Sequence, residues 1–219
     1  MSARSRIAVL ASGRGSNLQA ILAAIDAGRL EAEVVAVLSD KPDAPALRSV
    51  ADDRRWARSP KDFADRAGFD AALGDALAGF TPDWVVCAGY MRILGPAFVA
   101  RFAGRLVNIH PSLLPRYKGL HTHARALAAG DAEHGASVHF VVPELDAGTV
   151  LAQARVPVLP GDSPETLAQR VLSVEHPLLI ASLQWLVAGR VAERDGALHL
   201  DGHPLFSPLR LDCAGKLNE

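Results

Sequence analysis

An asparagine and a histidine near the middle of the chain have residue types and a spacing suited to acyl-group transfer. Asn108 and His110 come at the end of residues 106–110, a largely apolar run that predicts a buried strand. Side chains two apart leave a strand on the same side, so both should face one cleft, and Pro111 ends the strand because proline has no backbone donor. An amide and an imidazole side by side can polarise a carbonyl and protonate the group that forms from it.

A carboxylate further along the chain could complete this pair. Asp146 lies in a predicted tight turn, residues 144–148. A carboxylate near an imidazole favours the charged form, so the sequence predicts a raised pKa for His110 and better proton donation near neutral pH. Asn108 would donate a hydrogen bond to the developing oxyanion, a contact worth about 3 to 4 kcal/mol in other enzymes. Taken singly, each residue has a plainer interpretation, such as a satisfied loop histidine or a turn aspartate.

A loop with two glycines, residues 12–17, follows the first predicted strand and opens a helix. Glycines let the backbone approach a ligand, and the free N–H groups and dipole of a helix start attract an anion, for which phosphate is the natural candidate. The loop lacks the third glycine of a dinucleotide fingerprint and the lysine of a nucleotide P-loop. An ordinary glycine turn with Ser16 as the helix cap remains an alternative.

Strand and helix patterns alternate along the chain and predict an α/β fold, with a doubly wound, mostly parallel sheet in a single domain. Ligands bind such sheets at the carboxyl ends of the strands. Three candidate site segments lie at such ends: residues 12–17, 89–94 and 108–111. The predicted strands are 7–11, 34–38, 84–88, 106–110, 137–142 and 150–158. The predicted helices are 18–27, 46–54, 69–78, 96–102, a short one ending at 129, and 163–186 with a break at Pro177. A hairpin over 191–200 that turns at Asp195 and Gly196, and a loose tail over 204–219, complete the prediction.

The composition is that of a folded protein with small-molecule partners. Of the 219 residues, 49% are hydrophobic and 21% are charged, which is enough apolar material for a sizeable core. The formal net charge of -1 gives no global attraction to nucleic acid or a membrane, and no apolar run is long enough to span one. Cys87 and Cys213 match no zinc-ligand spacing, so we expect neither a disulfide framework nor a zinc site, and a reducing, cytoplasmic setting.

The other histidines carry weaker signals. His121 and His123 lie in a predicted loop and suggest a metal only weakly, while His134 has no local partner set. His139 lies on a predicted strand, where it could face the cleft or be a buried structural histidine.

Several motifs together make the chain resemble the phosphoribosylglycinamide formyltransferases, the folate-dependent enzymes of purine synthesis. They cover nearly the whole chain, as residues 12–20, 88–94, 107–115, 119–123, 134–140 and 144–148. The resemblance implies a Rossmann-like formyltransferase fold. It also implies transfer of the formyl group of 10-formyltetrahydrofolate to the amine of 5'-phosphoribosylglycinamide, without a metal, by a monomer or homodimer.

The resemblance also assigns roles to residues. It implies a catalytic trio of Asn108, His110 and Asp146. The expected phosphoribosylglycinamide-binding residues are Gly15, Ser16, Asn17, Gly89 and Glu175. The expected folate-binding residues are Arg66, Met91, Arg92, Ile93, Leu94, Asn108 and Leu145. On this basis residues 1–105 form a phosphate- and substrate-binding half, and residues 106–200 form a catalytic and folate-binding half. Ala147 replaces a glycine of many relatives, which should be tolerated if it needs no positive φ.

The trio alone leaves the formyl acceptor open, because formyltetrahydrofolate deformylase and methionyl-tRNA formyltransferase share it. We expect a deformylase to carry an extra N-terminal regulatory domain and a tRNA enzyme a basic C-terminal domain, and 219 residues have room for neither. A nucleotide-binding regulatory module without catalysis is a further alternative, against which the complete trio argues.

Overall fold

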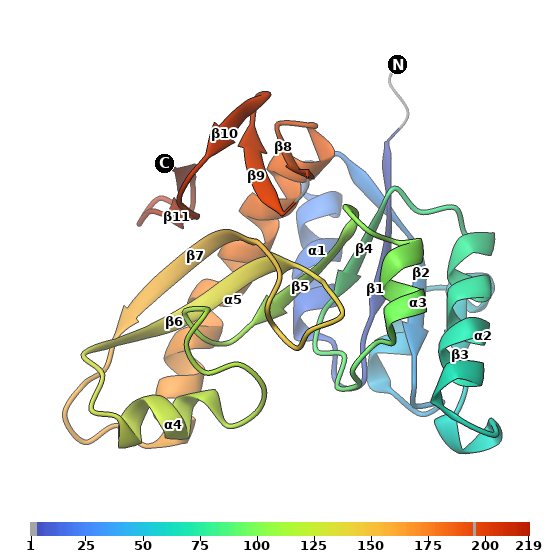
Figure 1. Cartoon of the computed structure of the whole chain (residues 1–219), viewed down its shortest axis with the longest axis horizontal. Helices are drawn as coiled ribbons and strands as arrows, with labels where there is room; N and C mark the ends of the chain where they lie inside the picture. The colour runs from blue at the N-terminus through green and yellow to red at the C-terminus, as the bar shows by residue number, and fades with distance from the viewer. Residues whose placement is uncertain (1–3, 195) are drawn as a thin grey trace. The chain divides into compact units, whose positions relative to one another are not determined.

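Parallel strands alternate with helices in a computed structural model that describes residues 4–194 and 196–219, which confirms the predicted α/β class (Figure 1). The chain divides into two compact units, one that ends at Asn108 and one that begins at Ile109. The boundary falls inside strand β5 (Leu106–His110), so the first unit contains Asn108 and the second contains His110.

The first unit is built on a parallel sheet in the order β5-β4-β1-β2-β3. Its central strand β1 is buried from Ile7 onward, which explains the continuous apolar run, because helices cover both faces of most parallel sheets. The carboxyl ends of β1 and β4 are neighbours, since the amide of Ser12 donates to the carbonyl of Gly89 over 3.1 Å. The segments 12–17 and 89–94 therefore leave the same edge of this sheet. The strands are β1 (Ser5–Leu10), β2 (Ala32–Ser39), β3 (Arg55–Ala57) and β4 (Trp84–Cys87).

The helices of the first unit correct two sequence-based boundaries. The helix predicted over 46–54 is wrong, because Val50 and Ala51 adopt extended backbone and leave two short 3-10 turns. The next helix begins at Arg66 instead of 69, since the Asp65 side chain caps it by accepting from the Gly68 amide over 2.8 Å. The helices are α1 (Ser16–Asp26), η1 (Pro45–Ser49), η2 (Asp52–Arg54), η3 (Pro60–Asp62), α2 (Arg66–Gly79) and α3 (Pro96–Arg101).

The second unit is organised around a long helix that packs on an antiparallel pair of strands. Helix α5 (Pro164–Val187) runs along β6 (Glu133–Phe140) and β7 (Val150–Pro157), as Figure 1 shows. Ser163 caps α5 and Pro164 occupies its first turn, as predicted. Its other elements are α4 (Thr122–Ala128), β8 (Val191–Arg194), β9 (Ala197–Leu200), β10 (His203–Leu205), β11 (Leu209–Leu211) and β12 (Leu217–Asn218).

Three features of the second unit differ from the sequence-based expectation. Pro177 does not break α5, because buried leucines after it hold the continuing helix against the strands. Strand β6 begins at Glu133 instead of 137, where its residues pair with β7. The tail forms strands, and β11 pairs in parallel with β7 and buries Leu209. Asp195, one of the two residues of the predicted turn between β8 and β9, lies outside the described residues.

Candidate active site

The second unit brings together two of the three predicted catalytic residues. His110 Nδ1 lies 3.4 Å from Asp146 Oδ2, and both side chains are more than 90% buried. The amide of Gly119 donates to Asp146 Oδ2 over 2.8 Å. His139 Nε2 lies 3.6 Å from the other carboxylate oxygen of Asp146. The Asp146 carboxylate therefore lies between two imidazoles. The sequence indicated His110 and left open whether His139 faces the cleft.

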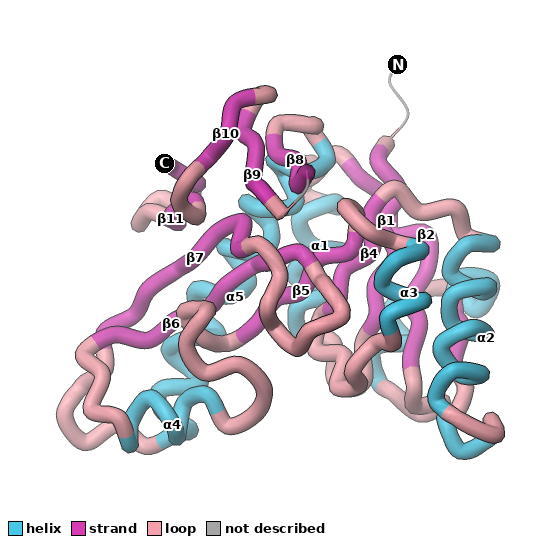
Figure 2. The backbone as a smooth tube through the Cα atoms, viewed as in Figure 1, coloured by secondary structure: helices cyan, strands magenta, loops and turns pink. Residues whose placement is uncertain are grey.

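The turn between β6 and β7 places Asp146 by an unusual backbone path. Figure 2 shows this segment as a loop, as it does the segment between β5 and α4 that contains Gly119. Asp146 has a φ of +46°, whereas Ala147 does not adopt a positive φ, which agrees with its tolerance as predicted. Gly148 is required, because a Cβ there would lie 1.9 Å from the carbonyl oxygen of Phe140.

Backbone carbonyls determine which nitrogen of each histidine carries hydrogen. His110 Nε2 lies 3.0 Å from the carbonyl oxygen of Tyr117, and a carbonyl can only accept, so Nε2 donates and carries the hydrogen. In the same way His139 Nδ1 donates to the carbonyl of Phe140 over 2.8 Å. Neutral His110 therefore presents the lone pair of Nδ1 toward Asp146, where it can accept a proton.

The charge state of this pair corrects the sequence-based prediction of a raised histidine pKa. Burial lowers the pKa of His110 below its ordinary value of 6.5, despite opposing contributions from the Tyr117 hydrogen bond and Asp146. Burial alone would raise the pKa of Asp146, but its interactions with His139, Gly119 and His110 outweigh burial and lower it. At neutral pH the site thus holds a carboxylate beside a neutral imidazole.

The third predicted catalytic residue precedes His110 on the same strand. Asn108 is half-buried and pairs in register with Cys87 of β4 in the first unit. Side chains alternate along a strand, so the position of both residues within β5 predicts that Asn108 and His110 leave it on the same side. The strand therefore delivers an amide and a proton acceptor two residues apart.

The loop over residues 12–17 has the features of an anion site. Gly15 adopts a φ of +78° at the N-cap of α1, and no side chain among the described residues caps this helix, so Ser16 is not its cap. A Cβ at Gly15 would lie 2.7 Å from Ala46 Cβ, so the close packing of η1 also requires glycine there. Asn17 is buried, and its Oδ1 has no hydrogen-bond partner in the described part of the chain. The Asn17 oxygen can only accept a hydrogen bond, but the first backbone N–H groups of a helix have no acceptor within it, and these donors favour an anionic ligand.

A buried serine that sequence reasoning missed joins this loop to the segment 89–94. The Ser12 hydroxyl donates to Asp40 over 2.5 Å and accepts from the amide of Met91 over 2.9 Å. The alternation of strand and polar loop in the sequence does not reveal this contact, because residues 12, 40 and 91 are far apart along the chain. The hydroxyl fixes the start of the segment in which four predicted folate-binding residues lie.

The other predicted binding residues occupy several environments. Met91 and Ile93 expose 65% and 51% of their surface, whereas Leu94 is buried. Gly89 has a φ of +74°, and the Arg92 guanidinium lies over the ring of Phe69. Arg66 begins α2 and lies 3.5 Å from Asp70. In the second unit, Leu145 is exposed beside Asp146, and Glu175 is half-buried on α5.

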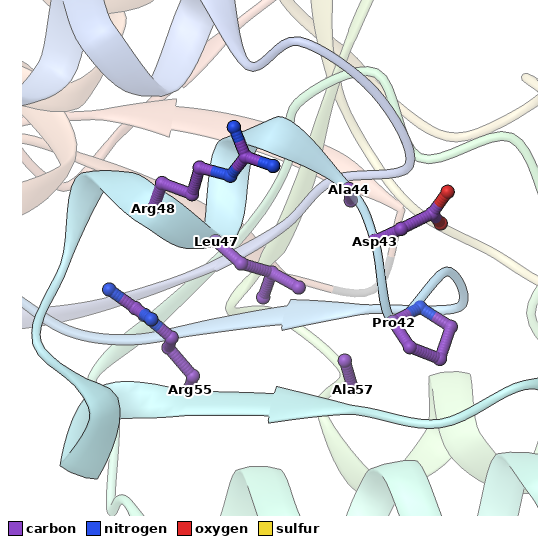
Figure 3. Close-up of a pocket in the computed structure, with 7 residues that line it drawn as sticks. All are labelled: Pro42, Asp43, Ala44, Leu47, Arg48, Arg55 and Ala57. Carbon is purple, nitrogen blue, oxygen red and sulfur yellow. The ribbon is translucent and has the colours of Figure 1, made fainter.

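A separate pocket of about 320 Å³ lies between η1 and β3 (Figure 3). None of the residues that line it is a predicted site residue. The Arg55 guanidinium is already bound to the Val50 carbonyl and paired with Asp52, so it does not offer a free charge to a ligand. The lining residues are Pro42, Asp43, Ala44, Leu47, Arg48, Arg55 and Ala57.

The described residues offer neither a metal-binding cluster nor a membrane-spanning helix. They contain no group of three or more His, Cys, Asp or Glu side chains placed to hold a metal ion. Nor is any helix in the described ranges long and apolar enough to cross a membrane.

Comparisons with known proteins define the class to which this fold and site belong. The family described as formyl transferase matches residues 5–183, and the chain belongs to it. The phosphoribosylglycinamide formyltransferase of Escherichia coli K12 is 47% identical over 201 residues, which are 91% of this chain and 95% of that protein. The solved phosphoribosylglycinamide formyltransferase of Coxiella burnetii has a TM-score of 0.88 at 46% identity, over 92% of this chain and 96% of that one.

A solved formyltetrahydrofolate deformylase from Pseudomonas syringae is more distant. It has a TM-score of 0.79 at 30% identity, and the match covers 90% of this chain but 66% of the deformylase.

The contact between His123 and His134 predicts a specific sensitivity of the folded protein to acid. His134 is buried and lies 3.2 Å from His123, and burial lowers the pKa of His134 to about 4. The unfolded chain binds this proton near pH 6.5, so the stabilisation is complete above that pH and is lost as the pH falls toward 4. Between pH 7 and pH 5, His134 should account for about 2 kcal/mol of lost unfolding free energy.

Urea unfolding at both pH values tests this prediction. Between pH 7 and pH 5, the unfolding free energy of His134→Gln should fall by about 2 kcal/mol less than that of the unaltered protein. This difference does not depend on how stable the variant is at pH 7. Equal losses in both proteins would contradict the assignment.

Proposed function

We propose that this protein is a phosphoribosylglycinamide formyltransferase, which transfers the formyl group of 10-formyltetrahydrofolate to the amine of 5'-phosphoribosylglycinamide in purine synthesis. The products are formylglycinamide ribonucleotide and tetrahydrofolate. The observation that carries the proposal is the buried Asp146 carboxylate beside His110, whose hydrogen on Nε2 leaves Nδ1 free to accept a proton. The high identity to relatives of that name over nearly their whole length supports it.

The trio accounts for each step of the transfer. As the amine attacks the formyl carbon, a C–N bond forms and neutral His110 accepts the amine proton at Nδ1. The Asp146 carboxylate stabilises the resulting imidazolium, while the Asn108 amide donates to the oxyanion. When the bond between the formyl carbon and the folate nitrogen breaks, the imidazolium returns its proton to that nitrogen. The protein groups balance the proton transfers without a metal.

Binding of the two substrates is assigned to the remaining residues. We assign the phosphate to the uncapped start of α1 at Gly15, Ser16 and Asn17, and the rest of the ribonucleotide to Gly89 and Glu175. The exposed apolar side chains of Met91 and Ile93 suit the flat pterin. The folate site is completed by Arg66, Arg92, Leu94, Asn108 and Leu145. The near-balanced charge supports small molecules as the partners, and we place the enzyme in the cytoplasm as a monomer or homodimer.

A negative charge at the start of α1 should weaken binding of the phosphorylated substrate. In Ser16→Asp, repulsion between carboxylate and phosphate should raise the KM for phosphoribosylglycinamide by about 10- to 100-fold, with a much smaller effect on the KM for the folate. Ala23→Asp adds the same charge to an exposed position later in α1 and should leave both constants unchanged. An unaltered KM in Ser16→Asp would place the phosphate elsewhere.

The proposed activity is tested by mixing the purified protein with 10-formyltetrahydrofolate, with and without phosphoribosylglycinamide. We expect the folate absorbance to change only when the ribonucleotide is present, with formation of the formylated product. Formate production without the ribonucleotide would favour a deformylase, the second candidate that the more distant structural likeness suggests. No turnover in either mixture by folded protein would contradict both activities.

A further inference from the structure

The residue that contacts His110 through its carbonyl has an uncommon backbone. Tyr117 adopts a φ of +55°, in the left-handed region that residues other than glycine rarely occupy. Its carbonyl oxygen accepts the hydrogen bond from His110 Nε2 over 3.0 Å. Such an unfavourable conformation persists only where the surroundings hold it in place, and it often marks a functional site.

The tyrosine side chain has contacts of its own that anchor it. The Tyr117 hydroxyl donates to Asp131 Oδ2 over 2.6 Å. The Arg125 guanidinium lies 5.3 Å from the centre of the tyrosine ring, and the ring of His134 packs against its edge at 6.0 Å. Asp131 also pairs with Arg116 over 3.0 Å. The anchor is therefore a part-buried hydroxyl–carboxylate bond, together with contacts of the aromatic ring to two other side chains.

Two acceptors compete for the single hydrogen of neutral His110. The Asp146 carboxylate is 3.4 Å from Nδ1 and, as an anion, is the stronger acceptor, so by itself it would draw the hydrogen to Nδ1. A hydrogen on Nδ1 would occupy the atom that must accept the proton of the attacking amine. The Tyr117 carbonyl opposes this by accepting from Nε2 at a shorter distance.

We propose that Tyr117, held by Asp131, is a positioning residue that keeps the hydrogen of His110 on Nε2 and the lone pair on Nδ1. The inference rests on the proposed catalytic role of His110. The side chain of Tyr117 acts at a distance, because its hydroxyl holds the strained backbone whose carbonyl faces the histidine.

The test combines kinetics with nitrogen NMR of the full-length protein. In Tyr117→Phe the ring remains but the bond to Asp131 is lost, so kcat should fall by roughly tenfold with little change in either KM. In Tyr117→Phe labelled with 15N-histidine, the chemical shifts of the two His110 ring nitrogens should show that the hydrogen lies on Nδ1 in a larger fraction of the molecules.

Two substitutions of Asp131 test the anchor itself. Asp131→Asn keeps an acceptor for the tyrosine hydroxyl and should retain most of kcat, whereas Asp131→Ala should behave like Tyr117→Phe. Arg116→Gln removes only the other partner of Asp131 and is the matched control, expected to match the unaltered protein.

Unchanged kcat and unchanged His110 shifts in Tyr117→Phe would overturn the proposal, as would equal effects of Asp131→Asn and Asp131→Ala. If Tyr117→Phe does not fold, the two Asp131 variants decide the question with the tyrosine in place. The nitrogen shifts are recorded without substrates, so they test positioning separately from the proposed activity. An active His110→Ala protein would overturn only the catalytic role of His110.

Discussion

Replacing His110 by alanine should lower kcat for formyl transfer by about a thousandfold or more, while the protein stays folded. The substitution removes the imidazole whose Nδ1 lone pair faces Asp146, and with it both the proton acceptor and the imidazolium that returns the proton. Binding of the substrates is assigned to other residues, so either KM should change by no more than a few-fold.

The loss of the imidazole also has a structural cost. It leaves the carbonyl of Tyr117 and one side of the Asp146 carboxylate without their contact, which should cost about 1 to 3 kcal/mol of unfolding free energy. This is less than the total stability of an ordinary domain, so circular dichroism should report a native fold.

His203→Ala is the matched control for this substitution, because His203 is an exposed histidine on β10. It should retain the kcat of the unaltered protein. If His110→Ala retained that kcat as well, His110 would have no part in the chemistry.

Replacing Asp146 by asparagine should lower kcat by about a hundredfold or more. Asparagine has nearly the same shape but cannot stabilise the imidazolium, and its amide can donate to the lone pair of His110 Nδ1 and block it. The amide of Gly119 can still donate to the remaining carbonyl oxygen, so the turn should keep its conformation.

The pH dependence of this variant has a definite direction. The rate requires neutral His110, so kcat/KM falls as the pH drops through its pKa, which burial places below 6.5. The Asp146 carboxylate raises the pKa of His110, and its removal lowers that pKa further. The acid limb of the pH profile, where kcat/KM falls, should therefore lie at a lower pH in Asp146→Asn than in the unaltered protein.

Rate profiles between pH 4.5 and pH 8 would measure this shift. Asp53→Asn removes an exposed carboxylate from η2 and should leave the profile unaltered. An acid limb of Asp146→Asn that coincides with the unaltered one would contradict the coupling between the two side chains.

Much of the fold could be predicted because its signals are local. The apolar run at Ile7 and the Ser163–Pro164 helix start follow from neighbouring residues, and the structure confirms both. The failures arose where distant contacts override local preference. Pro177 stays within a helix packed on β6 and β7, and Leu209 is buried by pairing with β7.

The sequence by itself determined the residue types and the strand spacing that place Asn108 and His110 on one side of β5, together with the resemblance that indicated Asp146. Only the tertiary structure decided the proton arrangement. His110 contacts the carbonyl of Tyr117, which has a left-handed backbone, and the buried Asp146 carboxylate, whose other oxygen contacts His139. Hydrogen placement and pKa depend on these surroundings and not on residue type alone, which is why the predicted rise in the pKa of His110 became a fall.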